Sequence, residues 1–482
     1  LITDIWKIKL MRKTLYSVVI AFVLSQGTLF GISEASALFL LISPGARAGG
    51  MGEAQVAVAN DAYASYWNPA GLAFLEDSEV ALMHVNWLQN LVPDMYYEFL
   101  AYHKHVPSLG TLGGHIIFLN LGEQERRGEN NEDLGTFTSF MYALTLSYGA
   151  KISPYSSIGL NAKILHQNLT GKGAGAERGE GVSTDFAFDL AYLQKGFLTP
   201  KLDMGITITN IGPKVSFIDE AQADPMPTNL TLGFNYRIID TEFNRLNLVV
   251  DFDKMLVASY PEMDWDGDGR VGLYNDNGKY VGEAGEYNES GDREAAHTDP
   301  IYLAFFTSWL DDWYLGGDID WDENTHIGGY YETGLRSGEL FDDYGADGNP
   351  ETDDDGEGNG EWDDGESFSD DDENGKWDSY EWGDEGYGKY NSDGELEVGT
   401  GANRSFSTEI DEMVFNLGFE YWYSKYFALR GGYYYDKLGK ISNPTFGIGL
   451  RFAGYGFDAG FTLGPPGHPL TNTVRFSLNM EF

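Results

Sequence analysis

The last nine residues of this chain alternate strictly between apolar and polar side chains. The apolar positions are Val474, Phe476, Leu478, Met480 and Phe482, and the polar positions between them are Arg475, Ser477, Asn479 and Glu481. A period of two places the two kinds of side chain on opposite faces of a β-strand. A strand that stays apolar on one face to its final residue is typical of an outer-membrane β-barrel, whose last strand closes the barrel and faces lipid.

The same alternation recurs from residue 79 onward. In one segment Phe446, Ile448 and Leu450 alternate with Gly447 and Gly449. Apolar positions on one side and small or polar positions on the other are the pattern of a transmembrane barrel strand. We therefore predict an all-β fold, a transmembrane outer-membrane β-barrel of about 14 antiparallel strands. The strands are expected at 79–86, 95–105, 111–121, 138–151, 156–167, 183–193, 201–211, 228–238, 244–254, 411–423, 426–436, 442–453, 456–463 and 472–482.

The connections between these strands alternate in length. Short ones are expected at 106–110, 153–155, 239–243 and 424–425, and long ones at 122–137, 168–182, 212–227 and 255–410. Outer-membrane barrels have short periplasmic turns and longer extracellular loops, so the long connections are expected outside the cell. A soluble β-sandwich or propeller would also explain the alternation. It does not explain the loop asymmetry together with an export signal and an apolar final strand.

The export signal lies near the N-terminus. Residues 1–10 precede Met11 as upstream sequence, Arg12 and Lys13 give a positive start, and the mostly apolar stretch 15–30 is followed by the small-x-small tripeptide 35–37. These features predict upstream residues and a secretory signal peptide over 1–37, cleaved after Ala37. The alternative, a membrane-anchor helix, fits less well because the apolar run is short.

The charge of the chain is strongly negative and unevenly distributed. The net charge is −44, and residues 341–397 alone carry 23 acidic and 2 basic residues, a net −21. Such a charge excludes nucleic acid as a partner, because the phosphate backbone is itself an anion. The chain has no cysteine, which excludes disulfides and thiolate metal sites.

A small-residue segment between the signal and the first strand carries a family resemblance. Residues 45–54 read GARAGGMGEA, residues 56–62 read VAVANDA, and residues 66–72 read YWNPAGL. This pattern closely resembles the PorV/PorQ family of outer-membrane proteins, relatives of the FadL long-chain fatty acid transporters. Its Asn68-Pro69-Ala70-Gly71 element occurs in both groups. The resemblance covers about 38–254 and 411–482.

The resemblance implies a barrel whose N-terminal segment plugs the lumen. The expected organisation is the signal region over 1–37, a plug over 38–78, strands one to nine over 79–254, an acidic extracellular insertion over 255–410, and strands ten to fourteen over 411–482. The plug motif is Asn68, Pro69, Ala70 and Gly71. The alternative for 38–78 is an ordinary periplasmic extension.

The insertion contains two near-repeats with the spacing of a calcium loop. The first has Asp355, Glu357, Asn359, Glu361, Asp363 and Glu366, and the second has Asp370, Asp372, Asn374, Lys376, Asp378 and Glu381. Each repeat places oxygen side chains at positions 1, 3, 5, 9 and 12, with glycine at position 6 and tryptophan at position 8. Calcium takes six to eight oxygen ligands, and this spacing supplies them in an EF-hand loop.

A weaker match begins with Asp264, Asp266 and Asp268 but ends on Asn275 instead of an acid. We predict Ca²⁺ in the extracellular insertion at these loops, where it would order an otherwise self-repelling segment. The alternative is a solvated acidic loop whose spacing arises by chance.

No sequence motif of an enzyme is present. The chain has no nucleophile elbow, zinc motif, phosphate-binding loop or dinucleotide fingerprint, so we predict that it is not an enzyme. The resemblance implies a PorV-like barrel of type IX secretion in the bacterial outer membrane, in contact with lipid, which binds and shuttles secreted cargo proteins together with other secretion components. A FadL-like transporter of long-chain fatty acids or other hydrophobic small molecules is the alternative. A third possibility is a surface scaffold that acts through a calcium-stiffened loop.

Overall fold

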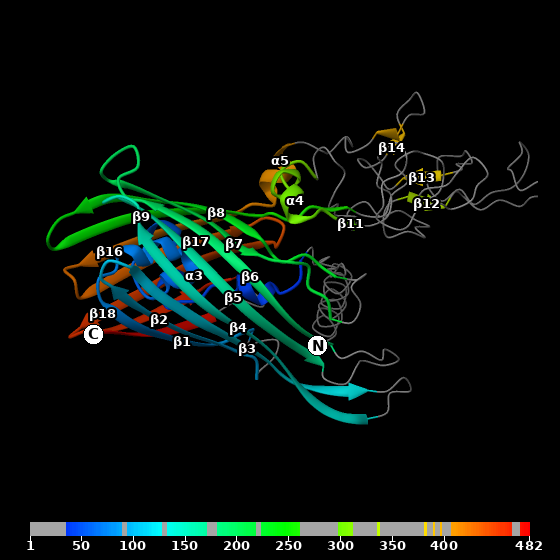
Figure 1. Cartoon of the computed structure of the whole chain (residues 1–482), viewed down its shortest axis with the longest axis horizontal. Coiled ribbons are helices and arrows are strands. Elements are labelled where there is room, and N and C mark those ends of the chain that lie inside the picture. Colours follow the sequence, from blue (N-terminus) through cyan, green and yellow to red (C-terminus); the bar gives the residue numbers. More distant parts are fainter. Residues whose placement is uncertain are drawn as a thin grey trace, which may run out of the picture.

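The computed structural model describes residues 35–88, 94–127, 133–170, 181–217, 223–260, 297–311, 406–464 and 473–482, and four short strands at 335–337, 380–382, 389–390 and 396–397. Its central feature is a closed antiparallel barrel of fourteen strands, in which each strand pairs with its neighbour in the chain. Between β9 and β16 the chain leaves the barrel and returns to it (Figure 1).

The barrel strands are β1 (Ser78–Asn86), β2 (Tyr96–Val106), β3 (Gly110–Arg127), β4 (Asp133–Lys151), β5 (Ser156–Thr170), β6 (Gly181–Gln194), β7 (Leu202–Ile211), β8 (Asn229–Asp240), β9 (Asn244–Met255), β16 (Val414–Tyr423), β17 (Phe427–Asp436), β18 (Ile441–Phe452), β19 (Tyr455–Thr462) and β20 (Thr473–Glu481). Closure comes from β1, where Leu82 pairs with Leu100 of β2 on one side and with Leu478 of β20 on the other.

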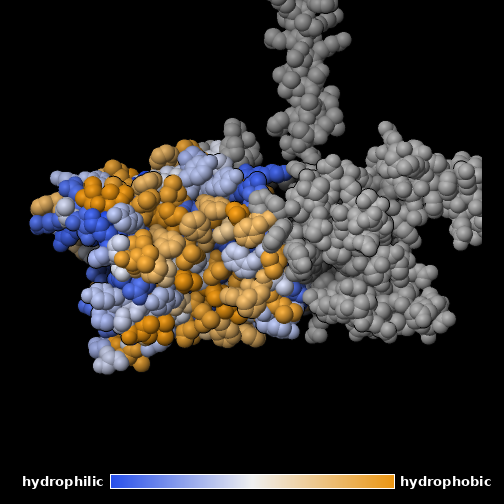
Figure 2. Space-filling model, turned by 90° about the horizontal axis from the view of Figure 1, so that it is seen from above, coloured by the Kyte–Doolittle hydropathy of each residue, from blue (hydrophilic) through white to orange (hydrophobic). Residues whose placement is uncertain are grey.

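The outer face of the barrel is apolar and the inner face is not. In β20, Phe476 is 51% exposed while its neighbour Arg475 is 2% exposed, so the alternation in the final residues has the expected orientation. Phe446 and Ile448 are likewise exposed on β18. Figure 2 shows apolar residues gathered over the side of the barrel, with hydrophilic residues concentrated at one end. This surface suits contact with the hydrocarbon of a bilayer.

The fourteen strands lie where the sequence predicts them, but β3 and β4 extend further. The predicted strands ended at residue 121 and began at residue 138, whereas β3 continues to Arg127 and β4 begins at Asp133. Beyond Asn120 the pairing contains two register irregularities. The apolar alternation also stops there, because no lipid-facing residue is needed where a hairpin rises beyond the membrane. That is why the period of two did not reveal these residues.

The plug, residues 38–77, lies inside the barrel before β1 (Figure 1). It consists of short helical turns, η1 (Leu38–Leu41), α2 (Ala46–Gly49), η2 (Val56–Val58), α3 (Ala64–Trp67) and η3 (Pro69–Phe74). One side of the plug is apolar: Tyr63 stacks on Phe99 of β2 with ring centroids 5.2 Å apart, within the largest core cluster. The opposite side is polar and faces β16 to β20.

The insertion is described only in part. It includes α4 (Ile301–Thr307) and α5 (Phe406–Asp411). Figure 1 shows both at the end of the barrel opposite the C-terminus. The small sheets pair β10 (Ser259–Tyr260) with β11 (His297–Thr298), β12 (Leu335–Ser337) with β13 (Tyr380–Trp382), and β14 (Lys389–Tyr390) with β15 (Leu396–Glu397). No helix in the described part of the chain is long and apolar enough to cross a membrane.

Three sequence predictions fall largely or wholly outside the described residues. The signal region before residue 35 is one of them. The others are the paired calcium loops, residues 355–366 and 370–381, and the weaker match at 264–268. They remain predictions.

Candidate functional site

The plug is joined to the barrel wall by a buried network of charges. Arg47 on α2 makes a bidentate pair with Glu420 on β16, at 2.8 and 2.9 Å, and a second pair with Asp61 of the plug at 2.9 Å. Glu420 also accepts from Arg430 on β17 at 3.0 Å. The Arg47 and Glu420 side chains are 7% and 1% exposed. Burial acts to lower the pKa of Arg47, but the carboxylates of Glu420 and Asp61 outweigh it and raise that pKa.

The network continues along the wall and is electrically balanced. Arg430 pairs with Asp458 on β19 at 2.7 Å, and Asp458 pairs with Arg451 on β18 at 2.7 Å. The six members are three guanidinium groups and three carboxylates, so the network is neutral as a whole. Neutrality matters because an uncompensated charge away from water is costly. Glu420 thus contacts both the plug and the wall, whereas Arg430 and Arg451 pair within the wall.

Other wall side chains accept backbone N–H groups of the plug. Asp251 on β9 accepts from the backbone nitrogens of Gln55 and Val56 at 2.7 and 2.9 Å. Glu79 on β1 accepts from Ala62 at 2.7 Å. These bonds satisfy amides that short helical turns leave unpaired, and a buried amide without a partner costs about 1–3 kcal/mol. The irregular backbone of the plug therefore depends on the wall.

Small residues allow the plug to touch the wall backbone directly. A Cβ added at Gly432 on β17 would lie 2.2 Å from the backbone nitrogen of Gly52, and one added at Gly159 on β5 would lie 2.1 Å from that of Ala70. No side chain fits in these gaps, since real Cβ contacts are never this short. The glycine and alanine content of residues 45–72 is explained by these close approaches.

Each residue of the predicted plug motif has a physical role in the fold. Asn68 is fully buried, caps η3 by accepting from Ala70 at 3.0 Å, and donates to the carbonyl of Val56 at 3.0 Å. Pro69 begins η3, where its missing N–H is not needed. A Cβ at Gly71 would lie 2.1 Å from the carbonyl oxygen of Ala59. These roles are structural, and no described contact assigns the motif a ligand.

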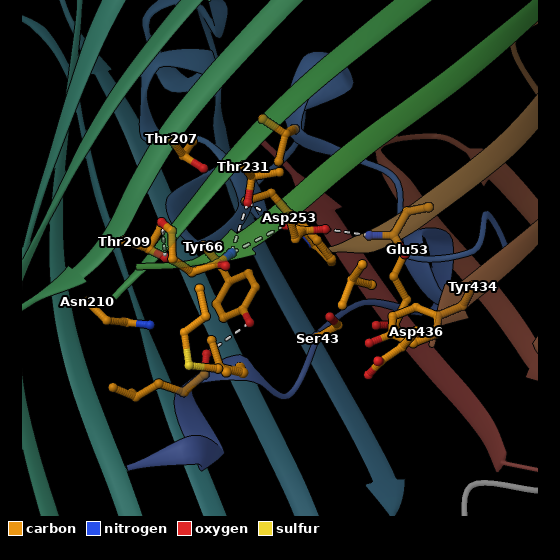
Figure 3. Close-up of a pocket in the computed structure, with 18 of the residues that line it drawn as sticks. Ser43, Glu53, Tyr66, Thr207, Thr209, Asn210, Thr231, Asp253, Tyr434 and Asp436 are labelled. Carbon is orange, nitrogen blue, oxygen red and sulfur yellow. Dashed lines mark hydrogen bonds between the residues drawn. The ribbon is translucent and has the colours of Figure 1, made fainter. Parts of the chain in front are cut away.

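A pocket lies between the plug and the inner faces of β5, β7, β8, β9, β16 and β17. This luminal pocket has a volume of about 300 Å³. In Figure 3, Thr207, Thr209 and Asn210 line one side, Glu53, Tyr434 and Asp436 line the other, and Tyr66 and Asp253 lie between. The sequence gave no indication of this pocket. The lining residues come from the plug and several strands, and only the closed barrel brings them together.

Asp253 is the most highly bonded polar group of the luminal pocket. Its carboxylate accepts from Thr231, from Asn229 at 3.3 Å and from Asn416 at 2.7 Å. Glu53 on the plug pairs with Arg475 on β20 at 2.9 Å. The pocket is therefore a polar, hydrogen-bonding space with acidic groups on both the plug and the wall.

The pairing of β6 with β7 becomes irregular and then ends part of the way along β6. The register is irregular between Phe188 and Leu190, and Asn210 on β7 has a left-handed backbone, with φ of 60°. The displaced Asn210 N–H donates to the Asp189 carboxylate at 2.8 Å, and Lys163 bridges Asp189 and the Asn210 side chain. Beyond this point residues 181–187 of β6 pair with β5 and have no β7 partner among the described residues.

The space beside this part of β6 is filled. Val215 and Met226, from the connection after β7, are 1% and 2% exposed and belong to the same apolar cluster as Leu165 and Ala187. The side chain of Asn210 donates to the carbonyl of Pro227 at 3.1 Å, which holds the connection to the wall. At the parting of β6 and β7, Lys163, Asp189 and Asn210 thus pair with one another, and Val215 and Met226 pack beside them.

No metal centre is found in the part of the chain that the structure describes, where no three His, Asp or Glu side chains converge closely enough to hold an ion. Of the predicted calcium residues, only Glu381 falls in a described strand, β13. The predicted ligand set therefore stays untested.

Comparison with known proteins gives a family match over slightly less than half of the chain. The family model described as "Type IX secretion system protein PorV" matches residues 31–262, which span the plug and β1 to β9. The match confirms the resemblance that the N-terminal motif predicts. It is to a secretion-system protein and not to an enzyme, in agreement with the sequence. A comparison with curated proteins gave no match.

Solved structures similar to this chain include two toluene transporters and a FadL homologue. The Pseudomonas putida toluene transporter TodX has 12% identity and a TM-score of 0.42, with 91% of this chain and 96% of that chain covered. The Ralstonia pickettii toluene transporter TbuX has 12% identity and a TM-score of 0.39, covering 92% and 98%. A Pseudomonas aeruginosa FadL homologue has 10% identity and a TM-score of 0.38, covering 91% and 97%. The closed fourteen-stranded barrel and the match of residues 31–262 indicate a barrel of the bacterial outer membrane that is similar to PorV over those residues.

Proposed function

We propose that this barrel serves type IX secretion as a binding protein that holds secreted cargo at the cell surface and passes it to other secretion components. The observation that supports this role over transport is the attachment of the plug. Arg47 is tied to Glu420, and the plug backbone is tied to Asp251 and Glu79, so the lumen is occupied by a fixed segment. A barrel of this kind acts through its surfaces and its pocket rather than as an open conduit.

A FadL-like transporter of hydrophobic compounds is the alternative, and the chemistry of the lumen disfavours it. A long-chain fatty acid carries a carboxylate, and in the luminal pocket it would meet Asp253, Asp436 and Glu53. Like charges at such short range repel strongly where water is scarce. In the described part of the chain the β6–β7 parting is also filled, because Lys163, Asp189 and Asn210 pair with one another and Val215 and Met226 pack beside them.

The test of the binding role is affinity purification of the tagged full-length protein from its native outer membrane, with mass spectrometry of the bound proteins. An equally tagged barrel of unrelated function from the same membrane is the control. We expect secreted proteins that share a C-terminal β-domain, together with large outer-membrane secretion components. Recovery of the barrel alone, with lipid or hydrocarbon retained, would refute the binding role and favour the transporter.

A parallel measurement tests transport directly. Full-length protein in proteoliposomes should take up oleate no faster than empty vesicles do. The matched control is the Glu420→Gln variant, in which the plug is expected to be loosened, so that a leak through the lumen becomes detectable. Saturable oleate uptake by the unaltered protein would contradict the proposed role.

We further propose that the acidic insertion binds Ca²⁺ at the loops beginning with Asp355 and Asp370. The support is the spacing of oxygen ligands described above. Because Trp362 and Trp377 lie within these loops, Tb³⁺ bound in place of Ca²⁺ should luminesce on tryptophan excitation, and excess Ca²⁺ should suppress the signal. The Asp370→Asn variant should lose part of the signal, whereas a change at Asp393, outside the spacing, should not. Equal signals from both variants would reject the loops as calcium sites.

A further inference from the structure

The luminal pocket contains more negative charge than its cations balance. Its charged lining residues are the acids Glu53, Asp253, Glu412 and Asp436 and the single base Lys163. Three of these five already have partners behind the lining: Glu53 pairs with Arg475, Glu412 with Lys254, and Lys163 with Asp189. Among the described residues, Asp253 and Asp436 have no cationic partner. The pocket therefore presents two unbalanced carboxylates.

A second observation points to a missing ligand at the same place. Asn416 on β16 is 5% exposed and lines the luminal pocket, and its amide nitrogen donates to Asp253. Its side-chain oxygen has no hydrogen-bond partner. A buried acceptor without a donor costs about 1–3 kcal/mol, so such groups normally have a partner. The orientation of Asn416 leaves an acceptor beside Asp253 that a donor could satisfy.

The arrangement suits an extended organic cation better than a metal ion. Asp253 lies on β9 and Asp436 ends β17, and in the described part of the chain no three acidic or histidine side chains converge as a metal requires. Besides its polar residues, the lining includes the aromatic residues Tyr66, Trp67 and Tyr434 and several aliphatic residues. Aromatic faces attract organic cations, and aliphatic walls accommodate an alkyl stem.

We propose that the luminal pocket binds an ammonium or guanidinium group carried on a short apolar stem. Asp253 and Asp436 supply the counter-charge, and Asn416 accepts a hydrogen bond from the cation. Either a free amine or the lysine or arginine side chain of an entering polypeptide has this chemistry. The inference goes beyond the secretion role and does not depend on it.

The experiment is isothermal titration calorimetry of the full-length protein in detergent, with agmatine as the probe. We expect saturable binding that weakens about tenfold or more in Asp253→Asn and in Asp436→Asn, because a charge-assisted bond is lost in each. Asp185→Asn on β6 is the matched control and should bind as the unaltered protein does, because Asp185 does not line the pocket. Retention of heat-modifiable mobility on gels verifies that each variant is folded.

Measurements on the unaltered protein keep the inference testable if a variant does not fold. Pentylamine should bind and its neutral counterpart pentan-1-ol should not, since the two differ in charge and little in size. A capped Gly-Arg-Gly peptide distinguishes the sources of the cation: binding of both peptide and agmatine supports a polypeptide side chain, and binding of agmatine alone supports a free amine. Equal binding of amine and alcohol, no binding of any cation, or unchanged affinity in both carboxylate variants would overturn the proposal.

Discussion

Replacing Glu420 with glutamine should release the plug from the wall without unfolding the barrel. The Glu420 carboxylate receives two hydrogen bonds from Arg47 and one from Arg430, and its side chain is 1% exposed. Glutamine has almost the same shape, so the change isolates the charge. Its amide group would direct N–H donors at guanidinium groups that are themselves donors only.

The size of the effect follows from the charge balance of the network. Three carboxylates face three guanidinium groups, and the substitution leaves one positive charge uncompensated away from water. Removing one partner of a buried ion pair costs about 3–5 kcal/mol. At about 1.4 kcal/mol for each factor of ten, the opening equilibrium of the plug should rise roughly a hundred- to several-thousand-fold.

Hydrogen exchange followed by mass spectrometry measures this opening directly. In the variant, amides of residues 45–62 should lose protection by that factor, while amides of β2 to β5 stay protected. Glu76→Gln is the control: its side chain is 79% exposed and lies 3.6 Å from Lys151, so its loss should change little. Unchanged protection of the plug in Glu420→Gln would show that the network does not hold the plug. Equal loss of protection in the barrel would show that plug and barrel open as one unit.

Three further predictions concern other parts of the molecule. Gly432→Ala should displace the plug and raise protease sensitivity near Gly52. Gly431→Ala should not, because a Cβ at residue 431 has only one neighbour, at 4.0 Å. Limited proteolysis of the two variants tests this difference. Burial, with the nearby acids, raises the pKa of Asp311 to about 8, so docking of the α4 segment should weaken as pH rises from about 4 to 8. Hydrogen exchange, corrected for the intrinsic exchange rates at each pH, measures this docking, and Asp311→Asn should abolish its pH dependence. Ile448→Arg on the lipid-facing side should cost up to about 2–4 kcal/mol in urea unfolding from bilayers, and an unchanged midpoint would place residue 448 outside the membrane.

The sign of the Asp311 prediction follows from proton linkage. A carboxyl group whose pKa is higher when docked binds more protons in that state, so docking is favoured at low pH and weakened above the ordinary pKa. The nearby charges are Glu409, Glu412 and Lys254, of which Lys254 opposes the two acids. A docked segment equally protected at pH 5 and pH 8 would contradict this account.

The strands could be predicted because the two faces of each strand lie in different environments. Lipid outside and a polar lumen inside impose a period of two, as in Phe446, Gly447 and Ile448, where the outer residues are exposed and the glycine contacts the plug. The period stops where that asymmetry stops. The extra residues of β3 and β4 lie in such a region, and this is why the predicted ends were too short.

The luminal pocket could not be predicted by the same reasoning. Alternation indicates that Asp253 faces inward, but not that Asn416 donates to it or that Glu53 of the plug lies across from it. These residues are separated by up to hundreds of positions in the chain, and their meeting depends on closure of the barrel. The motif in residues 66–72 signalled the plug because its roles, a cap and a close approach, are local.

The anchors of the plug lie on different strands, and this limits how the protein can respond to a partner. Glu420 on β16, Asp251 on β9 and Glu79 on β1 hold separate parts of the plug, and Ser477 on β20 accepts from Ala46 at 2.8 Å. Expelling the plug would require breaking all of these contacts at once, whereas binding at one place can bias only one of them. A change that begins in the luminal pocket would therefore act through the plug residues in its lining, such as Glu53 and Tyr66, and not through opening of the lumen.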